Sequence, residues 1–190
     1  MNRYYITDKD FKGTDFSKNG FEKGEYENCL FENCNFSNAN LSEVVFSECE
    51  FRNCDLSMAK ITKTAFRDVK FRNCKLLGLH FENCNGFLLS FDFENCNLDF
   101  SSFYRLSLKN QSFSNCSLQE VDFTESDLTG SSFDNCNLHK AIFDNTILEK
   151  AYFRTSYGFS IDPDHNKIRK AKFSVMGLSG LLDKYDIDIE

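Results

Sequence analysis

One short phrase recurs along this chain about every twenty residues. Each copy begins with Phe, carries Asn and Cys at its third and fourth positions, and ends in Phe or Leu. The six copies are FENCNF at 31–36, FRNCDL at 51–56, FRNCKL at 71–76, FENCNL at 93–98, FSNCSL at 113–118 and FDNCNL at 133–138. Self-similarity at a fixed period is typical of a solenoid, in which each unit buries its apolar side chains only by stacking on its neighbours.

A shorter period of five lies beneath this repeat. A large apolar residue occupies every fifth position from Phe11 to Phe81, and the series resumes at Leu88 and continues to Phe153. The two series differ in phase, which indicates a two-residue insertion near 85–87. A period of five matches neither the 3.6 residues of a helix nor the alternation of a strand. The chain therefore folds as something other than a helical bundle or a simple sheet.

The residue two places before each large apolar position is usually small. Cys34, Ala39 and Val44 show this in the first series, and the other three positions of each unit are mostly polar. One large and one small inward side chain per five residues describe one side of a narrow square tube. Over roughly residues 6–157 this pattern resembles the pentapeptide repeat family, whose consensus is a small residue, Asp or Asn, Leu or Phe, and two variable residues.

In that family four units form one coil of a right-handed quadrilateral β-helix. When the large positions are sorted by twenty, with the two extra residues removed, Phe and Leu alternate strictly by face in the second half. One inward column contains Leu88, Leu108, Leu128 and Leu148. The predicted fold is thus an all-β solenoid, a right-handed quadrilateral β-helix of about seven coils with a short C-terminal helix. We expect a β-helix with an N-terminal cap over 1–157, and a loop, helix and tail over 158–190.

Composition sets limits on location and partners. The chain has 190 residues, enough for one modest domain, and its net charge is −7. It has no apolar run near twenty residues and no charged start followed by an apolar stretch, so we expect a soluble cytoplasmic protein that does not bind membranes. The negative charge also argues against direct nucleic-acid binding by neutralisation of phosphates.

Nine cysteines have three possible explanations. Stacked cysteines could form disulfides, although parallel Cα–Cβ bonds suit a bridge poorly. The C-x4-C spacing of Cys29 and Cys34 could suggest metal ligands. The third explanation is that Cys is a small apolar filler of the tube, preceded by an Asn at each corner, and the repeat favours it. The column in question contains Cys34, Cys54, Cys74, Cys96, Cys116 and Cys136. We therefore expect reduced thiols and no metal site.

No pattern of catalytic residues is evident. A filled tube offers no pocket in which reactive groups could converge. His80, His139 and His165 fall at unrelated positions, so no two histidines are placed to share a substrate. The DPDHN segment begins like a calcium loop, but Lys167 stands where the turn requires Gly and Phe173 where a bidentate Glu is needed. We predict a non-enzymatic protein without catalytic residues or cofactors.

The repeat is least regular over residues 77–106. Phe87, Leu89, Phe100 and Tyr104 occupy positions that are normally polar and exposed. These side chains could cover one another in a local bulge. Alternatively, they form an apolar patch for a partner, because exposed apolar clusters often mark interfaces. The four residues are candidate interaction residues under the second interpretation.

After Phe153 the five-residue period decays. Residues 174–184 place apolar side chains on a helical stripe, despite the helix-weakening Gly177 and Gly180. The alternation of Ile with acidic residues over 187–189 predicts a short strand. The C-terminal segment either caps the last coil or forms a homodimer interface. The candidate dimerisation residues are Leu178, Leu181, Leu182 and Tyr185.

The family resemblance suggests a function. Its topoisomerase-protecting branch contains quinolone-resistance, albicidin-resistance and microcin-immunity proteins, which act on DNA gyrase or topoisomerase IV as rods resembling duplex DNA. In that branch a comparable C-terminal helix joins two copies end to end. The DP-x-x-N-x-I segment followed by a GL-containing helix is similar to the microcin-immunity type. The resemblance implies a DNA-mimicking binder of gyrase or topoisomerase IV. The alternative is an interaction module or scaffold with an unrelated partner.

The charge distribution bears on this choice. Duplex DNA carries about one charge per 1.7 Å, so a rod that imitates it should be strongly acidic. In this chain 29 acidic residues are diluted by 22 basic ones, and most faces are mixed. Only the surface around Asp122, Glu125 and Asp127 is locally acidic in the sequence pattern. Those three carboxylates are the candidate contacts for a topoisomerase.

Overall fold

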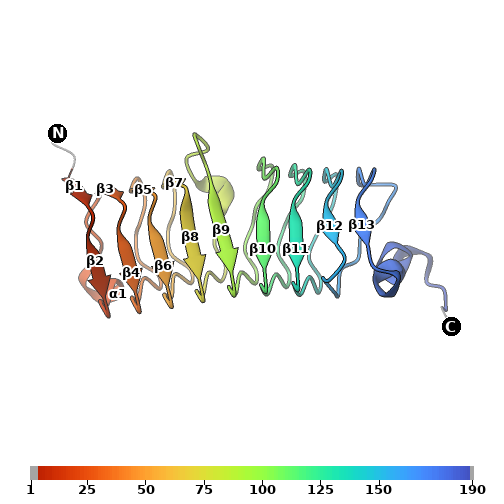
Figure 1. The fold of residues 1–190 in the computed structure, drawn as a ribbon, viewed down its shortest axis with the longest axis horizontal. Coiled ribbons are helices and arrows are strands. Elements are labelled where there is room, and N and C mark those ends of the chain that lie inside the picture. The colour runs from red at the N-terminus through yellow and green to blue at the C-terminus, as the bar shows by residue number, and fades with distance from the viewer. Residues whose placement is uncertain (1–3, 189–190) are drawn as a thin grey trace. The chain divides into compact units, whose positions relative to one another are not determined.

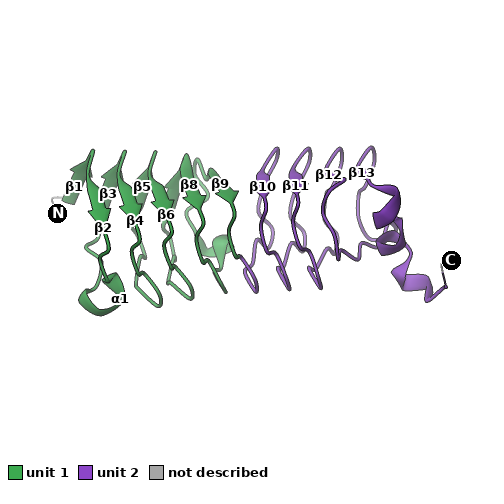
Figure 2. Ribbon diagram, turned by 60° about the horizontal axis from the view of Figure 1, so that its bottom comes forward, with its two compact units in different colours: residues 1–97 green, residues 98–190 purple. Residues whose placement is uncertain are grey.

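The computed structural model describes residues 4–188, which divide after Asn97 into two compact units, unit 1 before this point and unit 2 after it (Figure 2). Short strands and helical turns make up both units. In unit 1 they are β1 (Tyr4–Thr7), β2 (Asp10–Lys12), α1 (Phe16–Asn19), β3 (Gly24–Glu27), β4 (Leu30–Glu32), β5 (Val45–Ser47), β6 (Glu50–Arg52), β7 (Ala65–Arg67), β8 (Val69–Arg72), the 3-10 helix η1 (Phe81–Asn83) and β9 (Phe91–Glu94). In unit 2 they are β10 (Ser112–Ser114), β11 (Ser132–Asp134), β12 (Tyr152–Phe153), β13 (Lys172–Phe173) and the 3-10 helices η2 (Val175–Leu181) and η3 (Asp183–Tyr185).

The chain is a parallel β-solenoid of about eight turns, which confirms the predicted all-β solenoid. In unit 1, strands β1, β3, β5 and β7 form one parallel sheet, and β2, β4, β6, β8 and β9 form another (Figure 1). The register of the second sheet aligns Phe31 with Phe51 and Phe51 with Phe71. Residues twenty apart therefore stack, and the sequence period is the length of one coil.

Each coil turns its corners with residues in the left-handed region. Asn33, Asn53 and Asn73 have φ of 54°, 52° and 54°. Asn tolerates this conformation better than most residues, because its short polar side chain can hydrogen-bond locally. This backbone requirement explains the Asn that precedes each stacked Cys. The coils are then joined by backbone hydrogen bonds such as the one from Asn33 N to Arg52 O, 2.9 Å long.

The interior is filled by stacked large side chains and by small residues. The rings of Phe31 and Phe51 stack with centroids 4.7 Å apart, and both side chains are fully buried. At the small positions a side chain can satisfy a backbone carbonyl inside the tube. Thr64 donates to the Leu41 carbonyl at 2.7 Å, and Cys54 Sγ to the Phe31 carbonyl at 3.3 Å. Small residues are thus required at the inward positions two residues before each large side chain, where the side chain lies close to a backbone carbonyl.

Unit 2 repeats this construction. Strands β10 and β11 align Phe113 with Phe133, and β12 and β13 align Phe153 with Phe173. The coil ladder consequently continues to Phe173, beyond the periodic part of the sequence. Helices η2 and η3 follow β13 directly and cover this end of unit 2 (Figure 2).

The two-residue phase change is accommodated by a loop that protrudes between β8 and β9 (Figure 1). Here the register of the sheet aligns Phe71 with Phe93, an offset of 22 residues. The prediction that Leu88 points inward is wrong, because its side chain is 63% exposed and its φ is 57°. Phe91 takes its place in the interior, where it is 3% exposed and lies 5.2 Å from the ring of Phe81.

The C-terminal segment also differs from its predicted form. Residues 175–181 form a 3-10 helix rather than an α-helix. A Cβ on Gly180 would lie 2.2 Å from the backbone oxygen of Phe159, so this glycine lets the segment approach the last coil closely. Residues 186–188 form no strand, and Ile189 lies outside the described residues. Within residues 4–188, no helix has the length and apolar character needed to cross a bilayer.

Candidate functional site

Apolar side chains fill the interior of the coils in the described residues 4–188. In each unit the inward aromatic side chains are fully buried and pack on their neighbours, as Phe51 does on Phe71 and Phe123 on Phe103. Among residues 4–188, no three His, Cys, Asp or Glu side chains are grouped so that they could hold a metal ion. The surfaces that remain for function lie on the outside of the coils and at the C-terminal segment.

The 86–90 loop of unit 1 presents apolar side chains to solvent. Phe87 is 67% exposed, Leu88 is also largely exposed, and Leu89 is half-buried. The guanidinium of Arg67 lies 6.0 Å from the ring centroid of Phe87, which is within reach of a weak cation–π interaction. The loop is held at its start by Asn85, whose side chain accepts a hydrogen bond from Phe87 N at 3.0 Å. Phe87 is therefore displayed on an anchored loop.

The other two predicted interaction residues belong to unit 2. Phe100 is exposed and adopts a φ of 62°, at a corner where the chain more often places Asn. Tyr104 is half-buried, and the guanidinium of Arg105 lies 4.7 Å from its ring centroid. The four candidates thus divide into the exposed Phe87 and half-buried Leu89 on the 86–90 loop of unit 1 and a pair on the first coil of unit 2.

The predicted acidic surface is substantially neutralised. Glu125 accepts hydrogen bonds from Arg105, with 2.7 Å to Nε and 3.1 Å to Nη2. Asp127 pairs with Lys109 at 3.2 Å. Asp122 accepts a hydrogen bond from Thr124 N at 2.8 Å. The structure brings the three carboxylates onto neighbouring faces of one coil but gives two of them a cation each.

The ion pairs also affect proton affinity. The side-chain hydrogen bond from Arg105 holds the pKa of Glu125 below its usual range. Partial burial raises the pKa of Asp127, but hydrogen bonds from Thr129 and from Lys109 outweigh this effect and leave the pKa lowered. Both groups are therefore ionised at neutral pH, with their charge compensated on the adjacent coil.

The C-terminal segment exposes apolar side chains from both of its helices. Leu178 and Tyr185 are 46% and 57% exposed, Leu182 is 36% exposed, and Leu181 is half-buried. Helix η2 is capped at its N-terminus by Ser174, whose Oγ accepts a hydrogen bond from Gly177 N at 3.1 Å. The four predicted dimerisation residues therefore differ in accessibility, and Leu181 contributes least to the surface.

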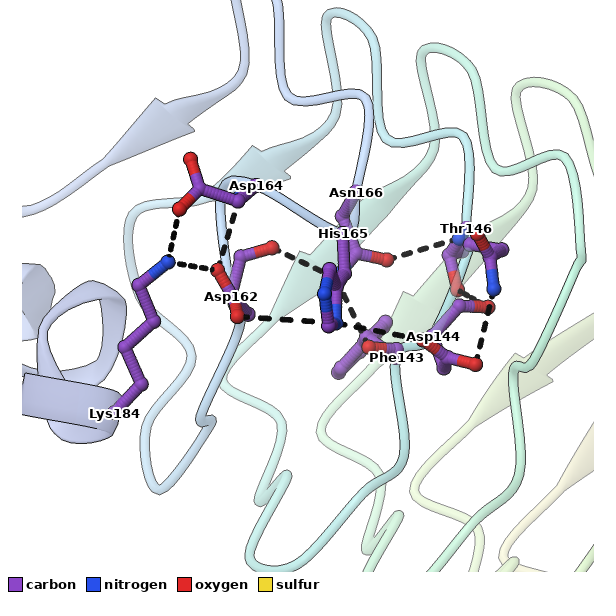
Figure 3. A network of polar contacts seen from close by, with 9 residues as sticks. Phe143, Asp144, Thr146, Asp162, Asp164, His165, Asn166 and Lys184 are labelled. Carbon is purple, nitrogen blue, oxygen red and sulfur yellow. Dashed lines mark hydrogen bonds and ion pairs between the residues drawn. The ribbon is translucent and has the colours of Figure 1, made fainter.

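A lysine fastens this segment to the last coil (Figure 3). Lys184 Nζ lies 2.6 Å from Asp162 Oδ1 and also pairs with Asp164. The hydrogen bond from Lys184 lowers the pKa of Asp162. His165 lies on the other side of Asp162, with Nδ1 3.9 Å from carboxylates of both Asp162 and Asp144. The DPDHN segment is thus a structural anchor for η3.

The cysteines are all free thiols, and eight of the nine are buried. Their sulfurs donate to backbone carbonyls of the preceding coil, as Cys74 does to Phe51 at 3.4 Å. Burial raises the pKa of Cys49 to about 12. The only half-buried thiol is that of Cys84, in the coil with the protruding loop. The column therefore packs as filler.

A basic surface near the end of unit 2 was not predicted from the sequence. Six exposed cations gather on two consecutive coils near the end of unit 2, within residues 150–172. The KIRKAK run at 167–172 could have signalled it. The average over the chain concealed it, because the net charge of −7 combines this region with acidic ones.

The stacked parallel strands and the filled interior define the chain as a β-solenoid built from short repeats. The chain matches the family model described as pentapeptide repeat region over residues 24–92 and 87–157, and it belongs to that family. No match was found among curated protein sequences.

Solved structures of other proteins are similar to the chain. Full-length QnrB1, a plasmid-mediated fluoroquinolone resistance protein, is 19% identical, with a TM-score of 0.51, and the match covers 97% of this chain and 100% of that one. HetL, a pentapeptide repeat protein involved in heterocyst differentiation regulation from the cyanobacterium Nostoc sp. strain PCC 7120, is 17% identical, with a TM-score of 0.40 and coverage of 89% and 88%. At these identities the QnrB1 match shows a common fold.

Proposed function

We propose that the protein is a non-catalytic binding module that acts in the cytoplasm through the outer faces of its coils. The observation that carries this proposal is the filled interior, because the stacked Phe and Leu side chains leave only the outside for recognition. Pentapeptide repeat proteins are generally structural or binding proteins rather than enzymes. Solenoids commonly use their extended surfaces in this way.

The partner that we propose is bacterial DNA gyrase or topoisomerase IV, with resistance or immunity to topoisomerase poisons as the outcome. Family membership and the fold shared with a fluoroquinolone resistance protein support this choice. Because Glu125 and Asp127 are each paired with a cation, contact through a bare acidic face is not the simplest form of the interaction. We propose that exposed aromatic residues, Phe87 above all, contribute to recognition.

The experiment is DNA supercoiling by purified gyrase while the protein is titrated in, with and without a fluoroquinolone. Inhibition at high protein concentration, or relief of drug-trapped cleavage at low concentration, supports the proposal. Phe87→Glu should weaken either effect. Met58→Glu is the matched control, because Met58 is also exposed on unit 1, at 59%. Equal behaviour of the two variants would remove Phe87 from the interface.

A second candidate function is an interaction module with an unrelated partner. The ion pairs of Glu125 and Asp127 favour it, because they remove much of the acidity that imitation of DNA requires. Absence of any effect on gyrase and topoisomerase IV would favour this alternative.

In either case we propose a homodimer that forms through the exposed apolar residues of η2 and η3, which are the candidate dimerisation residues.

A further inference from the structure

A basic surface covers one corner of the last two coils of unit 2. We call it the basic corner, and it comprises Lys150, Arg154, Lys167, Arg169, Lys170 and Lys172. All six side chains are exposed. Within residues 150–172 the only acidic residues are Asp162 and Asp164, and both are paired with Lys184. Basic residues therefore outnumber acidic ones in this stretch.

The cations of the basic corner also lack ion-pair partners across coils. Among the described residues, none of the six lies within 4.0 Å of a carboxylate oxygen, whereas Arg105 and Lys109 of the same unit are both paired. The nearest carboxylate along the chain is that of Glu149, beside Lys150, and it forms no ion pair with the corner. A group of exposed cations without ion pairs attracts a polyanion at low ionic strength.

The solenoid register places these charges side by side. Ile147 aligns with Lys167, and Tyr152 aligns with Lys172. Lys150 and Lys170, with φ of 58° and 61°, occupy the same corner in consecutive coils. Neighbouring coils are about 4.8 Å apart, so the six cations lie within a small area that spans two faces. Several of them can contact one polyanionic chain at the same time.

Two exposed tyrosines border the basic corner. Tyr152 is 40% exposed and Tyr157 is 59% exposed. Lys172 Nζ lies 4.3 Å from the ring centroid of Tyr152 and donates a hydrogen bond to its hydroxyl oxygen at 3.3 Å. Arg154 lies between the two tyrosines in the sequence of the same coil. Cations interleaved with exposed aromatic rings are typical of surfaces on which unpaired bases stack while phosphates are neutralised.

We propose that the basic corner binds single-stranded nucleic acid. The cations would contact phosphates, and Tyr152 and Tyr157 would stack on bases. The exposed rings favour this ligand over an acidic protein segment, which has no bases to place on them. The proposal modifies the expectation from net charge, because electrostatic attraction depends on the local surface rather than on the chain average. It is independent of the proposed topoisomerase partner.

The proposal makes a quantitative statement about salt. If about four phosphates are neutralised, the logarithm of the affinity should fall with the logarithm of salt concentration with a slope of about −2.8. That corresponds to a loss of roughly 50-fold between about 50 and 200 mM salt.

The test uses the full chain and a fluorescein-labelled oligo-dT of about fifteen nucleotides, a length within the usual site sizes. Fluorescence anisotropy should show binding at low salt with the expected slope. Lys150→Glu combined with Lys170→Glu should weaken binding about tenfold or more. The matched control is Lys60→Glu with Lys75→Glu, which changes the net charge by the same amount at exposed lysines of unit 1. It should weaken oligo-dT binding by less than about twofold, because the altered charges lie far from the basic corner in sequence.

A second pair of variants tests base stacking. Tyr157→Ser should weaken oligo-dT binding about fivefold or more without a change in salt slope, while Tyr5→Ser, at an equally exposed tyrosine of unit 1, should have no effect. Absence of binding, equal weakening by the two lysine pairs, or equal effects of the tyrosine variants would overturn the proposal. Competition by poly-glutamate as effective as that by oligo-dT would instead identify an acidic protein as the ligand and also overturn it.

Discussion

Arg105 and Glu125 form a two-point ion pair between consecutive coils, with 2.7 Å from Nε and 3.1 Å from Nη2 to the two carboxylate oxygens. The arginine also lies against the ring of Tyr104, so one side chain joins a predicted apolar residue to a predicted acidic one. Two features that the sequence suggests as separate binding determinants are therefore parts of one cluster.

This cluster predicts the behaviour of Arg105→Gln. Loss of the guanidinium should raise the pKa of Glu125 toward its ordinary value, because the hydrogen bond from Arg105 is the main cause of the lowered pKa. A carboxyl group with a lowered folded-state pKa stabilises the fold above its unfolded pKa, and this contribution disappears as the pH falls through the folded value. Titration of Glu125 by NMR measures the shift. Arg154→Gln, at an exposed arginine without an ion pair, should leave it unchanged.

A second prediction concerns the coil that carries the inserted residues. Phe91→Ala should lower the free energy of unfolding by about 3–5 kcal/mol, because Phe91 fills the interior position that Leu88 leaves empty. Phe87→Ala, four residues earlier on the exposed loop, should change it by less than about 0.5 kcal/mol. Chemical denaturation measures both. Comparable losses for the two variants would contradict the assignment of Phe91 to the interior.

Phe91 also shows where inference from the sequence ends. The columns of Phe31, Phe51 and Phe71 follow from the period alone, and the offset of 22 residues to Phe93 follows from the phase change. The period predicts that Leu88 enters the tube, but Phe91 does so instead, and both are large and apolar. That choice depends on how the inserted residues leave the coil, which is a property of packing.

Surface neighbours on adjacent coils are easier to predict from the sequence than the conformation of the 86–90 loop. Arg105 and Glu125 are twenty residues apart, as are Lys150 and Lys170, so the period that reveals the fold also pairs surface residues. Cross-coil ion pairs could be predicted by sorting charged residues in the same way as apolar ones. The 3-10 helices beyond Phe173 could not, because no repeat extends into them and their form depends on the close approach of Gly180 to Phe159.

The cysteine column leads to a third prediction. In the native protein at neutral pH, a thiol reagent such as DTNB should modify at most Cys84 at an appreciable rate, because the other eight thiols are buried. Burial also raises the pKa of Cys49 to about 12, which removes the reactive thiolate. In denaturant all nine thiols should react. A lower total without prior reduction would indicate disulfides and contradict the assignment of free thiols.

The lysine anchor of η3 leads to a prediction about acid. The lowered pKa of Asp162 means that its attachment to Lys184 persists at neutral pH and is lost only as the pH falls through the lowered folded-state value, below the ordinary aspartate range near 3.9. Lys184→Met should remove the attachment at every pH. Hydrogen exchange of residues 175–185 measures it. Lys109→Met, which breaks the pair with Asp127 elsewhere in unit 2, should leave that exchange unchanged.

The last prediction concerns the proposed homodimer. The exposed apolar side chains of the C-terminal segment include Val175 and Met176, at 85% and 91%, beyond the residues singled out from the sequence. An apolar surface of this kind is stabilised when a second copy covers it. If it forms a dimer interface, Leu178→Asp with Leu182→Asp should shift the protein from dimer to monomer in sedimentation velocity. Both positions are exposed, so the fold should persist.

Ile142→Asp is the control for this experiment, because Ile142 is 50% exposed on a coil face of the same unit, away from η2 and η3 in sequence. It introduces a carboxylate on an apolar surface without touching the C-terminal segment. A dimer that survives the Leu178 and Leu182 changes but dissociates with Ile142→Asp would move the interface to the coil faces. If the unmodified protein sediments as a monomer at micromolar concentrations, the homodimer proposal is wrong. The C-terminal helices would then only cap the last coil.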